Sequence, residues 1–347
     1  MRKRVPECMP SELTPKEVRL LYDKLESQNK VAEALGITRS QVRTLLGRSQ
    51  DSSQDRVILP TFPDEDISAE EILDHMGRRF QQRLEREDAL RWFSVRFTGM
   101  EPVGLTFVGD PHLGSNGCHV SLLRQDVDIM ANTEGVVCVN LGDTVDGWGG
   151  YLIKLYAEND VSRETEKRLA KWFLQEAGIP WKVWLIGNHD TMGDFSSYLK
   201  AINAEQIPMI DWQARFKLVF PDKSEIKIDA AHNHKGTSIY NPLHGQKRAA
   251  LWSGNADIYI AGHHHNWAIT QEELEDGRVI HMARARGYKW LDTFAVTHGF
   301  NSKQYGASIM FVIDPQEEAP TRRIKSFADL SEGAKYLTWK RNQGSQS

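Results

Sequence analysis

Five short groups of Asp, Asn and His residues have the types and spacing to bind metal ions. They are Asp110 and His112; Asp143 and Asp146; Asn188, His189 and Asp190; His232 and His234; and His263, His264 and His265. Together these side chains suit borderline divalent metals such as Mn, Fe or Zn better than Mg or Ca alone. Two such ions held about 3.5 to 4 Å apart can clamp the attacking and leaving oxygens of a phosphoester. The pattern therefore predicts a two-metal phosphoesterase site.

Each group directly follows a short apolar or β-branched run of the sequence. The runs cover residues 103–108, 136–141, 183–186, 226–231 and 258–261. Runs of this length that end at a Gly or a tight turn predict buried strands. Strand ends that share one rim of a sheet can aim side chains from distant sequence positions at one point. We therefore expect the five groups to converge.

Taken in order, the groups resemble the motifs of the calcineurin-like metallophosphoesterase superfamily. That pattern runs D-x-H, GD-x-x-D, GNH-D/E, a single His and GH-x-H, and here it covers residues 102–314. The resemblance implies an α/β fold, a four-layer αββα sandwich in which two β-sheets pack face to face with helices outside. It also implies two divalent metal ions, manganese foremost, with iron, zinc, nickel and magnesium as alternatives.

The resemblance implies seven metal ligands, with Asp143 as the bridge between two ions. One ion would also bind Asp110, His112 and His265, and the other Asn188, His232 and His263. A hydroxide held between the ions would attack phosphorus, because cations lower the pKa of bound water.

By the same resemblance, His189 is the general acid that protonates the leaving oxygen. We expect Asp146 to hydrogen-bond His189 and keep it oriented and protonated. His232 directly follows the 226–231 run and so matches the single His of the pattern, whereas His234 is expected to support the ligands or face the substrate. His264 lies between two ligands, where its side chain would point away.

One departure from a branch of the superfamily bears on the substrate. The protein phosphatase branch has Arg directly after GD-x-x-D, where this chain has Gly147, and GNHE where this chain has Asp190. An Arg that grips a phosphomonoester with two hydrogen bonds is therefore missing from that place. This favours phosphodiesters, including nucleic acids, as in the repair exonucleases of the superfamily. Three later cations could contact a polyanion or pair with surface acids: Arg284, Arg286 and Lys289.

Residues 1–48 are predicted to form a small all-α helix-turn-helix domain. Thr14 with Glu17 and Thr38 with Gln41 have the spacing of capping boxes, and Gly36 can end the helix before the turn. Residues 30–46 resemble the helix-turn-helix of bacterial and phage DNA-binding proteins. The residues expected to face DNA are Arg39, Ser40, Gln41, Arg43 and Thr44. The alternative is a three-helix bundle that only packs against the catalytic domain or a partner.

The rest of the chain is predicted to divide into four segments. Residues 49–67, rich in Ser, Asp and Pro, have the composition of a linker. Residues 68–98 would hold a connecting helix whose apolar positions, Ile72, Leu73, Met76, Phe80 and Leu84, form one packed face. Residues 99–330 would be the metallophosphoesterase domain and residues 331–347 a C-terminal tail.

Composition sets outer limits on partners and location. The net charge of −4 gives no global attraction to nucleic acid, although residues 1–50 carry a local excess of +4. No apolar run is long enough to span a membrane, and the basic N-terminus lacks the apolar stretch of a signal peptide. We expect a cytoplasmic protein of bacterial or phage origin that binds DNA and a phosphoester substrate but no membrane, with a homodimer left open.

Three functions remain in competition. The first is a DNA-binding nuclease that hydrolyses phosphodiester bonds. The second is a phosphatase or phosphodiesterase acting on nucleotides or other small phosphoesters, with the helix-turn-helix used for regulation or assembly. The third is a DNA-binding regulator whose phosphoesterase fold is only a scaffold, and the intact ligand set speaks against it.

Overall fold

The computed structural model describes residues 14–48, 68–90, 92–159, 161–290 and 307–344. The chain divides into two compact units, Met1–Asp74 and His75–Ser347. The predicted linker, residues 49–67, lies outside the described residues.

The smaller unit contains three short helices: α1 (Pro15–Leu25), α2 (Gln28–Leu35) and α3 (Arg39–Arg48). Both predicted capping boxes form, since the backbone N–H of Thr14 donates to Glu17 and that of Thr38 to Gln41, at 3.0 and 2.8 Å. Gly36 ends α2 with a left-handed φ of 66°. Buried valines, with no exposed surface, join the three helices: Val18, Val31 and Val42.

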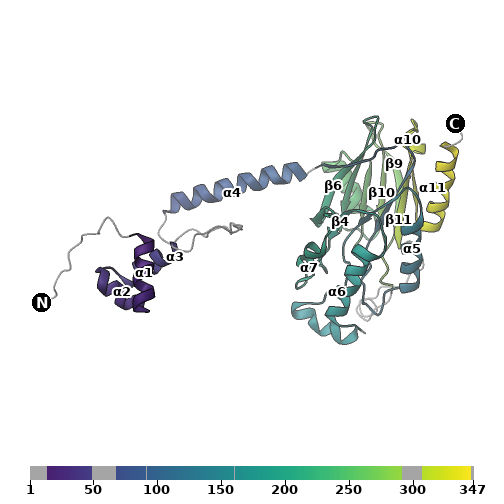
Figure 1. Cartoon of the computed structure of the whole chain (residues 1–347). Coiled ribbons are helices and arrows are strands. Elements are labelled where there is room, and N and C mark those ends of the chain that lie inside the picture. Colours follow the sequence, from purple (N-terminus) through teal and green to yellow (C-terminus); the bar gives the residue numbers. More distant parts are fainter. Residues whose placement is uncertain (1–13, 49–67, 91, 160, 291–306, 345–347) are drawn as a thin grey trace. The chain divides into compact units, whose positions relative to one another are not determined.

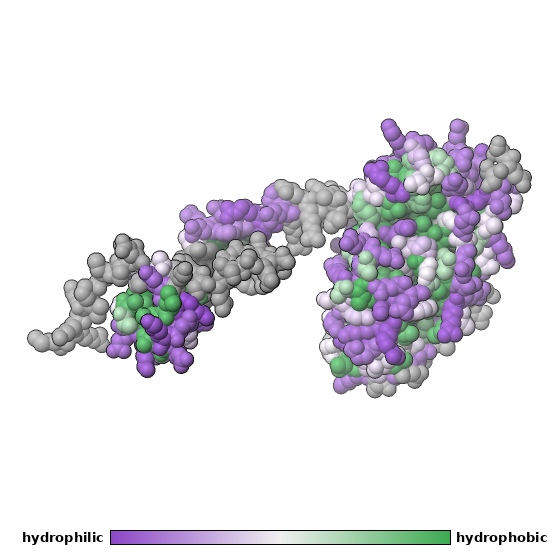
Figure 2. All heavy atoms as spheres, viewed as in Figure 1, coloured by the Kyte–Doolittle hydropathy of each residue, from purple (hydrophilic) through white to green (hydrophobic). Residues whose placement is uncertain are grey.

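Helix α4 (Ala69–Leu90) directly follows Ser68, whose backbone N–H donates to Glu71 at 3.1 Å. Its predicted packed face is wrong: Leu73, Met76 and Phe80 are each about 60% exposed. None of the four buried hydrophobic clusters of the described residues includes a residue of α4. The side of α4 that is visible in Figure 2 is mainly hydrophilic. Apolar spacing predicted the helix here but not its packing.

The larger unit is built on two six-stranded β-sheets (Figure 1). The first sheet has the strand order β1 (Phe93–Arg96), β6 (Gln213–Val219), β7 (Glu225–Ala231), β8 (Ile258–Ala261), β10 (Val279–Arg284) and β9 (Ala268–Glu273). The second has the order β12 (Ile324–Phe327), β11 (Ser308–Ile313), β2 (Val103–Val108), β3 (Val136–Asn140), β4 (Trp181–Ile186) and β5 (Met209–Asp211).

Helices cover the outer faces of both sheets. The second sheet packs against helices α5 (Val120–Asn132), α6 (Arg163–Lys171), α7 (Phe195–Ile202) and α11 (Leu330–Gly344), together with a π-helical turn η2 (Trp172–Glu176) that continues α6. The first sheet packs against α8 (His244–Ser253). The remaining pieces are a 3-10 helix η1 (Gly150–Glu158) and the short α10 (Pro320–Arg323). The unit therefore has the expected four layers: helices, sheet, sheet and helix.

The main core lies between the two sheets. In β2, alternate residues Leu105 and Phe107 point into it, and the ring of Phe107 meets that of Phe311 edge to face at 5.8 Å. Ile228 and Ile258 enter from the opposite sheet, and all are fully buried. Each such side chain contributes about 1.5 to 3 kcal/mol relative to exposure. This core holds the two sheets, and hence their ends, in fixed positions.

All five predicted apolar runs are strands in the structure: β2, β3, β4, β7 and β8. In the segment expected to be a C-terminal tail, α11 runs from Leu330 to Gly344 and buries Leu337 against the second sheet. In Figure 1 this helix lies beside β11 and α5. Among the described residues, no helix combines the length and apolar character that crossing a bilayer requires.

Candidate metal centre

The five residue groups all begin at the carboxyl ends of parallel strands. Strands β2, β3 and β4 are parallel neighbours in one sheet, and β7 and β8 are parallel neighbours in the other. Hydrogen bonds join the following loops, since Asp110 N–H donates to Gly142 O at 3.1 Å and Gly262 N–H to His232 O at 3.0 Å. The sheet order therefore brings ligands from distant sequence positions to one edge of the sandwich.

Five of the predicted ligands have a left-handed backbone, which is rare outside glycine and costs free energy. Their φ angles lie between 44° and 70°: Asp110, His112, Asp143, His263 and His265. The loops are also crowded at their glycines. A Cβ on Gly142, whose φ is 98°, would lie 2.6 Å from the backbone nitrogen of Gly187. Strain held at one place by a packed core is typical of functional sites.

The seven predicted ligands fall into two groups that meet at Asp143. In the first, Asp110, His112 and His265 place their ligand atoms within 4.8 Å of one another. In the second, Asp143, His232 and His263 do the same. Asn188 joins the second group, because its Oδ1 lies 2.9 Å from His232 Nε2.

The carboxylate of Asp143 lies between the two groups. Its Oδ2 is 3.3 Å from His232 Nε2 on one side and 3.9 Å from His112 Nε2 on the other. Its Oδ1 accepts a hydrogen bond from the backbone N–H of His189 at 2.8 Å. Burial alone would raise the pKa of Asp143, but His232, His189 and His112 outweigh it and hold that pKa well below its ordinary value.

Asp110 is the second fully buried carboxylate of the cluster. Both of its oxygens accept from the backbone N–H of His263, at 3.1 and 2.9 Å. Burial, together with the nearby charge of Asp143, raises the pKa of Asp110 to about 8. Two carboxylates this deeply buried need positive charge nearby.

The donor set fits a pair of divalent cations better than it fits protons. Nε2 of His232 has three acceptors within reach: Asn188 Oδ1 at 2.9 Å, His263 Nδ1 at 3.0 Å and Asp143 Oδ2 at 3.3 Å. One N–H cannot serve all three, whereas a cation among them can. In the other group, His112 Nε2 is buried and has no hydrogen-bond partner among the residues that the structure describes. Asp, Asn and imidazole are ligands that borderline divalent metals accept.

The Asp146 side chain supports His112. Its Oδ1 lies 2.7 Å from His112 Nδ1 and accepts from Lys289 Nζ at 2.8 Å, and all three side chains are buried. The sequence predicts that this carboxylate hydrogen-bonds His189, but in the structure it contacts His112 and Lys289 instead. A third grouping that could hold a metal, His112, Asp146 and His189, is better explained by these hydrogen bonds.

His189 is fixed through the backbone of Asp146 instead. Its Nδ1 lies 2.6 Å from the carbonyl oxygen of Asp146. Because a carbonyl only accepts, Nδ1 carries a proton, which leaves Nε2 as the atom that can face a substrate. The ring lies edge to face with His112 and with Trp148, each at 4.7 Å. The sequence pattern did not indicate Trp148.

Two other histidines take no part in the ligand groups. His234 is buried and its Nε2 lies 3.1 Å from Asp229 Oδ1, so it belongs to a separate polar network. His264 is half-buried, and its ring lies 5.0 Å from that of His263. The contact of His234 with Asp229 differs from its expected role, which is to support the ligands or face the substrate.

The three late cations are all buried. Lys289 contacts Asp146, as described above, and Arg284 donates to Asn266 Oδ1 at 3.2 Å. Arg286 lies over the ring of Trp290 at 4.4 Å. Burial lowers the pKa of both arginines to about 10.

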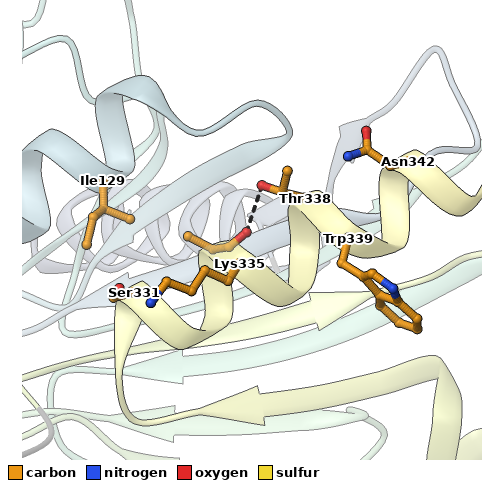
Figure 3. A pocket seen from close by; sticks show the side chains of 7 residues that line it. Ile129, Ser331, Lys335, Thr338, Trp339 and Asn342 are labelled. Carbon is orange, nitrogen blue, oxygen red and sulfur yellow. Dashed lines mark hydrogen bonds between the residues drawn. The ribbon is translucent and has the colours of Figure 1, made fainter.

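A pocket of about 490 Å³ lies elsewhere, between α5 and α11. Figure 3 shows its lining, which includes Ile129, Lys335 and Trp339. It contains no His or carboxylate side chain. This pocket is therefore not the chemical centre of the molecule.

Comparison with known proteins finds a family match over part of the chain. Residues 104–267 match the family model described as calcineurin-like phosphoesterase. A search of curated proteins found no match.

Similar solved structures include a conserved protein from Streptococcus pneumoniae TIGR4 that is described as a predicted phosphoesterase. It is 13% identical to this chain, with a TM-score of 0.31, and the match covers 66% of this chain and 99% of that one. Another is the calcineurin-like phosphoesterase YfkN from Bacillus subtilis, at 10% identity and a TM-score of 0.37. The match covers 70% of this chain and 97% of that one. A phosphatase from Mycoplasma pneumoniae is 14% identical, with a TM-score of 0.34, and the match covers 66% of this chain and 93% of that one. Sequence identities and TM-scores this low say nothing about the activity of this chain.

Proposed function

We propose that this chain, which carries a calcineurin-like phosphoesterase domain, is a two-metal phosphodiesterase that cleaves DNA. The observation that carries the proposal is the position of Asp143 between two ligand groups, within 3.3 Å of His232 and 3.9 Å of His112. When bound, two divalent ions would neutralise the phosphate and lower the pKa of a bound water.

The side chains that would hold the ions are those of the two groups. Asp143 would be shared, with Asp110, His112 and His265 on one side and Asn188, His232 and His263 on the other. Asp146 would act through His112: because it accepts from Nδ1, it leaves the Nε2 lone pair directed away from it, toward the ligand group. Manganese is our proposed metal.

His189 would donate a proton to the leaving oxygen. With Nδ1 tied to a carbonyl at 2.6 Å, its doubly protonated form keeps that hydrogen bond and carries the second proton on Nε2. The contacts with His112 and Trp148 hold the ring in one orientation. General acid catalysis of this kind typically contributes 10²- to 10⁴-fold in rate, an order-of-magnitude figure.

The site geometry supports diesters over monoesters. The residue after Asp146 is Gly147, with a φ of 55°, and a Cβ there would lie 2.8 Å from the carbonyl oxygen of His189. An Arg clamp at that position is therefore disfavoured sterically, not merely absent from the sequence. A diester carries one charge fewer than a monoester and depends less on such a clamp.

The N-terminal unit is our proposed DNA-binding element. Arg39, Ser40, Arg43 and Thr44 are exposed on α3, as groove contacts would require. Gln41 differs, because its side-chain oxygen accepts from the backbone of Thr38, and this limits its use for base contacts. Replacing Arg39 and Arg43 with Ala should weaken DNA binding and flatten its salt dependence. Unchanged affinity would assign the unit to packing or assembly.

An assay panel tests the proposal. The full-length protein with manganese is offered linear duplex DNA, single-stranded DNA, cyclic dinucleotides and p-nitrophenyl esters. We expect DNA cleavage that requires His189. Turnover of a small ester while every DNA substrate stays intact would refute the nuclease proposal and favour a phosphatase or a nucleotide phosphodiesterase.

A further inference from the structure

Trp212 occupies an unusual place beside the candidate metal centre. It lies between β5 and β6 and has a left-handed φ of 69°. Its backbone is tied down on both sides: its N–H donates to Ile186 O at 3.1 Å, and its carbonyl accepts from His232 N–H at 2.7 Å. A left-handed backbone costs a bulky residue free energy, so the rest of the fold must stabilise this conformation.

The ring of Trp212 touches two of the predicted ligands. It lies 5.2 Å from the ring of His232, at an interplanar angle of 70°, and 6.3 Å from the ring of His263. Both histidines belong to the second ligand group. The ring is thus placed beside that group.

Folding alone does not explain this tryptophan. Trp212 is 43% exposed and belongs to none of the hydrophobic clusters of the described residues. By contrast, Trp181 and Trp184 on the neighbouring strand are at most 3% exposed and pack in the core. A tryptophan kept for stability would bury its ring, because the apolar area is what stabilises.

We propose that Trp212 is the stacking surface for a nucleobase of the substrate, on the Asn188–His232–His263 side of the scissile phosphate. This inference rests on the proposed function and specifies its substrate. Aromatic side chains stack on any base, so the contact would select nucleotides without selecting sequence. A base within a duplex already has both faces covered. The nucleotide next to the scissile phosphate must therefore be unpaired, as in a single strand or a frayed end.

The test compares two ligands that differ only in the base. Calorimetry measures the binding of a deoxyadenosine phosphonate and of the matching base-free deoxyribose phosphonate to the metal-loaded full-length protein. We expect the base to improve affinity about 10- to 100-fold. Trp212→Ala should remove most of that preference while leaving affinity for the base-free ligand unchanged, and Trp212→Phe should keep most of it.

The control is Trp339→Ala, which alters a tryptophan that is 51% exposed on α11, in the separate pocket of Figure 3. It should retain the full preference. Trp212→Ala that preserves the preference, or that weakens both ligands equally, would refute the stacking role. Equal affinity of the wild-type protein for the two ligands would refute the stacking role too, even if DNA is cleaved. Discrimination without DNA cleavage would support the stacking role and refute the nuclease proposal instead.

Discussion

Nδ1 of His112 lies 2.7 Å from Oδ1 of Asp146, and both side chains are at most 1% exposed. This contact fixes which imidazole nitrogen is protonated and turns Nε2 toward Asp143. Burial, with Lys289 nearby, lowers the pKa of His112 to about 3, so the ring is neutral at physiological pH. A neutral imidazole with a fixed lone pair is the state in which histidine binds a metal.

Asp146→Asn should therefore weaken metal binding, because the amide lacks the charge that orients His112. Loss of such a supporting carboxylate typically costs about 10- to 100-fold in metal affinity. Titration calorimetry with manganese gives the affinity directly. The matched control is Asp229→Asn, which alters another buried carboxylate that contacts a histidine, His234, outside the ligand groups. Equal effects of the two substitutions would contradict the role of Asp146.

His189→Gln should lower kcat about 10²- to 10⁴-fold on substrates with a poor leaving group. The loss should be much smaller for p-nitrophenyl esters, because a good leaving group needs little protonation. Metal content should not change. Steady-state kinetics on both substrate types check this, with His264→Gln as the neighbouring control. A loss that is the same for both leaving groups would contradict general acid catalysis.

The pH dependence of stability should report on Asp126. Burial raises its pKa from 3.8 to about 6, although Tyr288 donates a hydrogen bond to it at 2.6 Å. Since the folded state binds this proton more tightly than the unfolded state, stability falls as pH rises through about 6. Asp126→Asn removes that loss. As the pH rises from 4 to 8, the free energy of unfolding of Asp126→Asn should increase relative to that of the wild type by about 2 to 3 kcal/mol.

Chemical denaturation at a series of pH values measures this difference. Asp128→Asn, on the exposed side of the same helix α5, is the control and should follow the wild type. A constant difference between Asp126→Asn and the wild type across this pH range would show that the Asp126 carboxyl titrates normally.

Gly142→Ala should disrupt the metal centre. The site combines a φ of 98° with a backbone nitrogen, that of Gly187, only 2.6 Å from the added Cβ. Gly277 has a similar φ of 80° but nothing within 4 Å, so Gly277→Ala should cost only about 1 to 2 kcal/mol. Thermal unfolding and manganese titration of both variants measure the difference between them. Normal manganese binding by Gly142→Ala would mean that the loop can rearrange without loss of the site.

Much of the fold could be predicted because its strands are continuous apolar runs. β2 and β8 begin and end where the sequence indicated, at residues 103–108 and 258–261. Ligands placed directly after such strands must lie at the strand ends, so the sequence predicted the two groups that meet at Asp143. Their roles as metal ligands stay a prediction.

Other features depend on the folded backbone and leave no trace in spacing. The orientation of the Asp146 carboxylate toward His112 follows from its turn and from Lys289, more than 140 residues later. Trp212 precedes its ligand neighbours by 20 and 51 residues and belongs to no periodic pattern. The exposed apolar side chains of α4 had the spacing of a packed face. Periodicity shows which residues share a face but not what covers it.

Anomalous diffraction from a crystal soaked in manganese tests the central claim most directly. We predict two peaks about 3.5 to 4 Å apart, both bound by Asp143. One should lie among Asp110, His112 and His265, and the other among Asn188, His232 and His263. A single peak, or manganese bound away from the Asp143 carboxylate, would contradict the account.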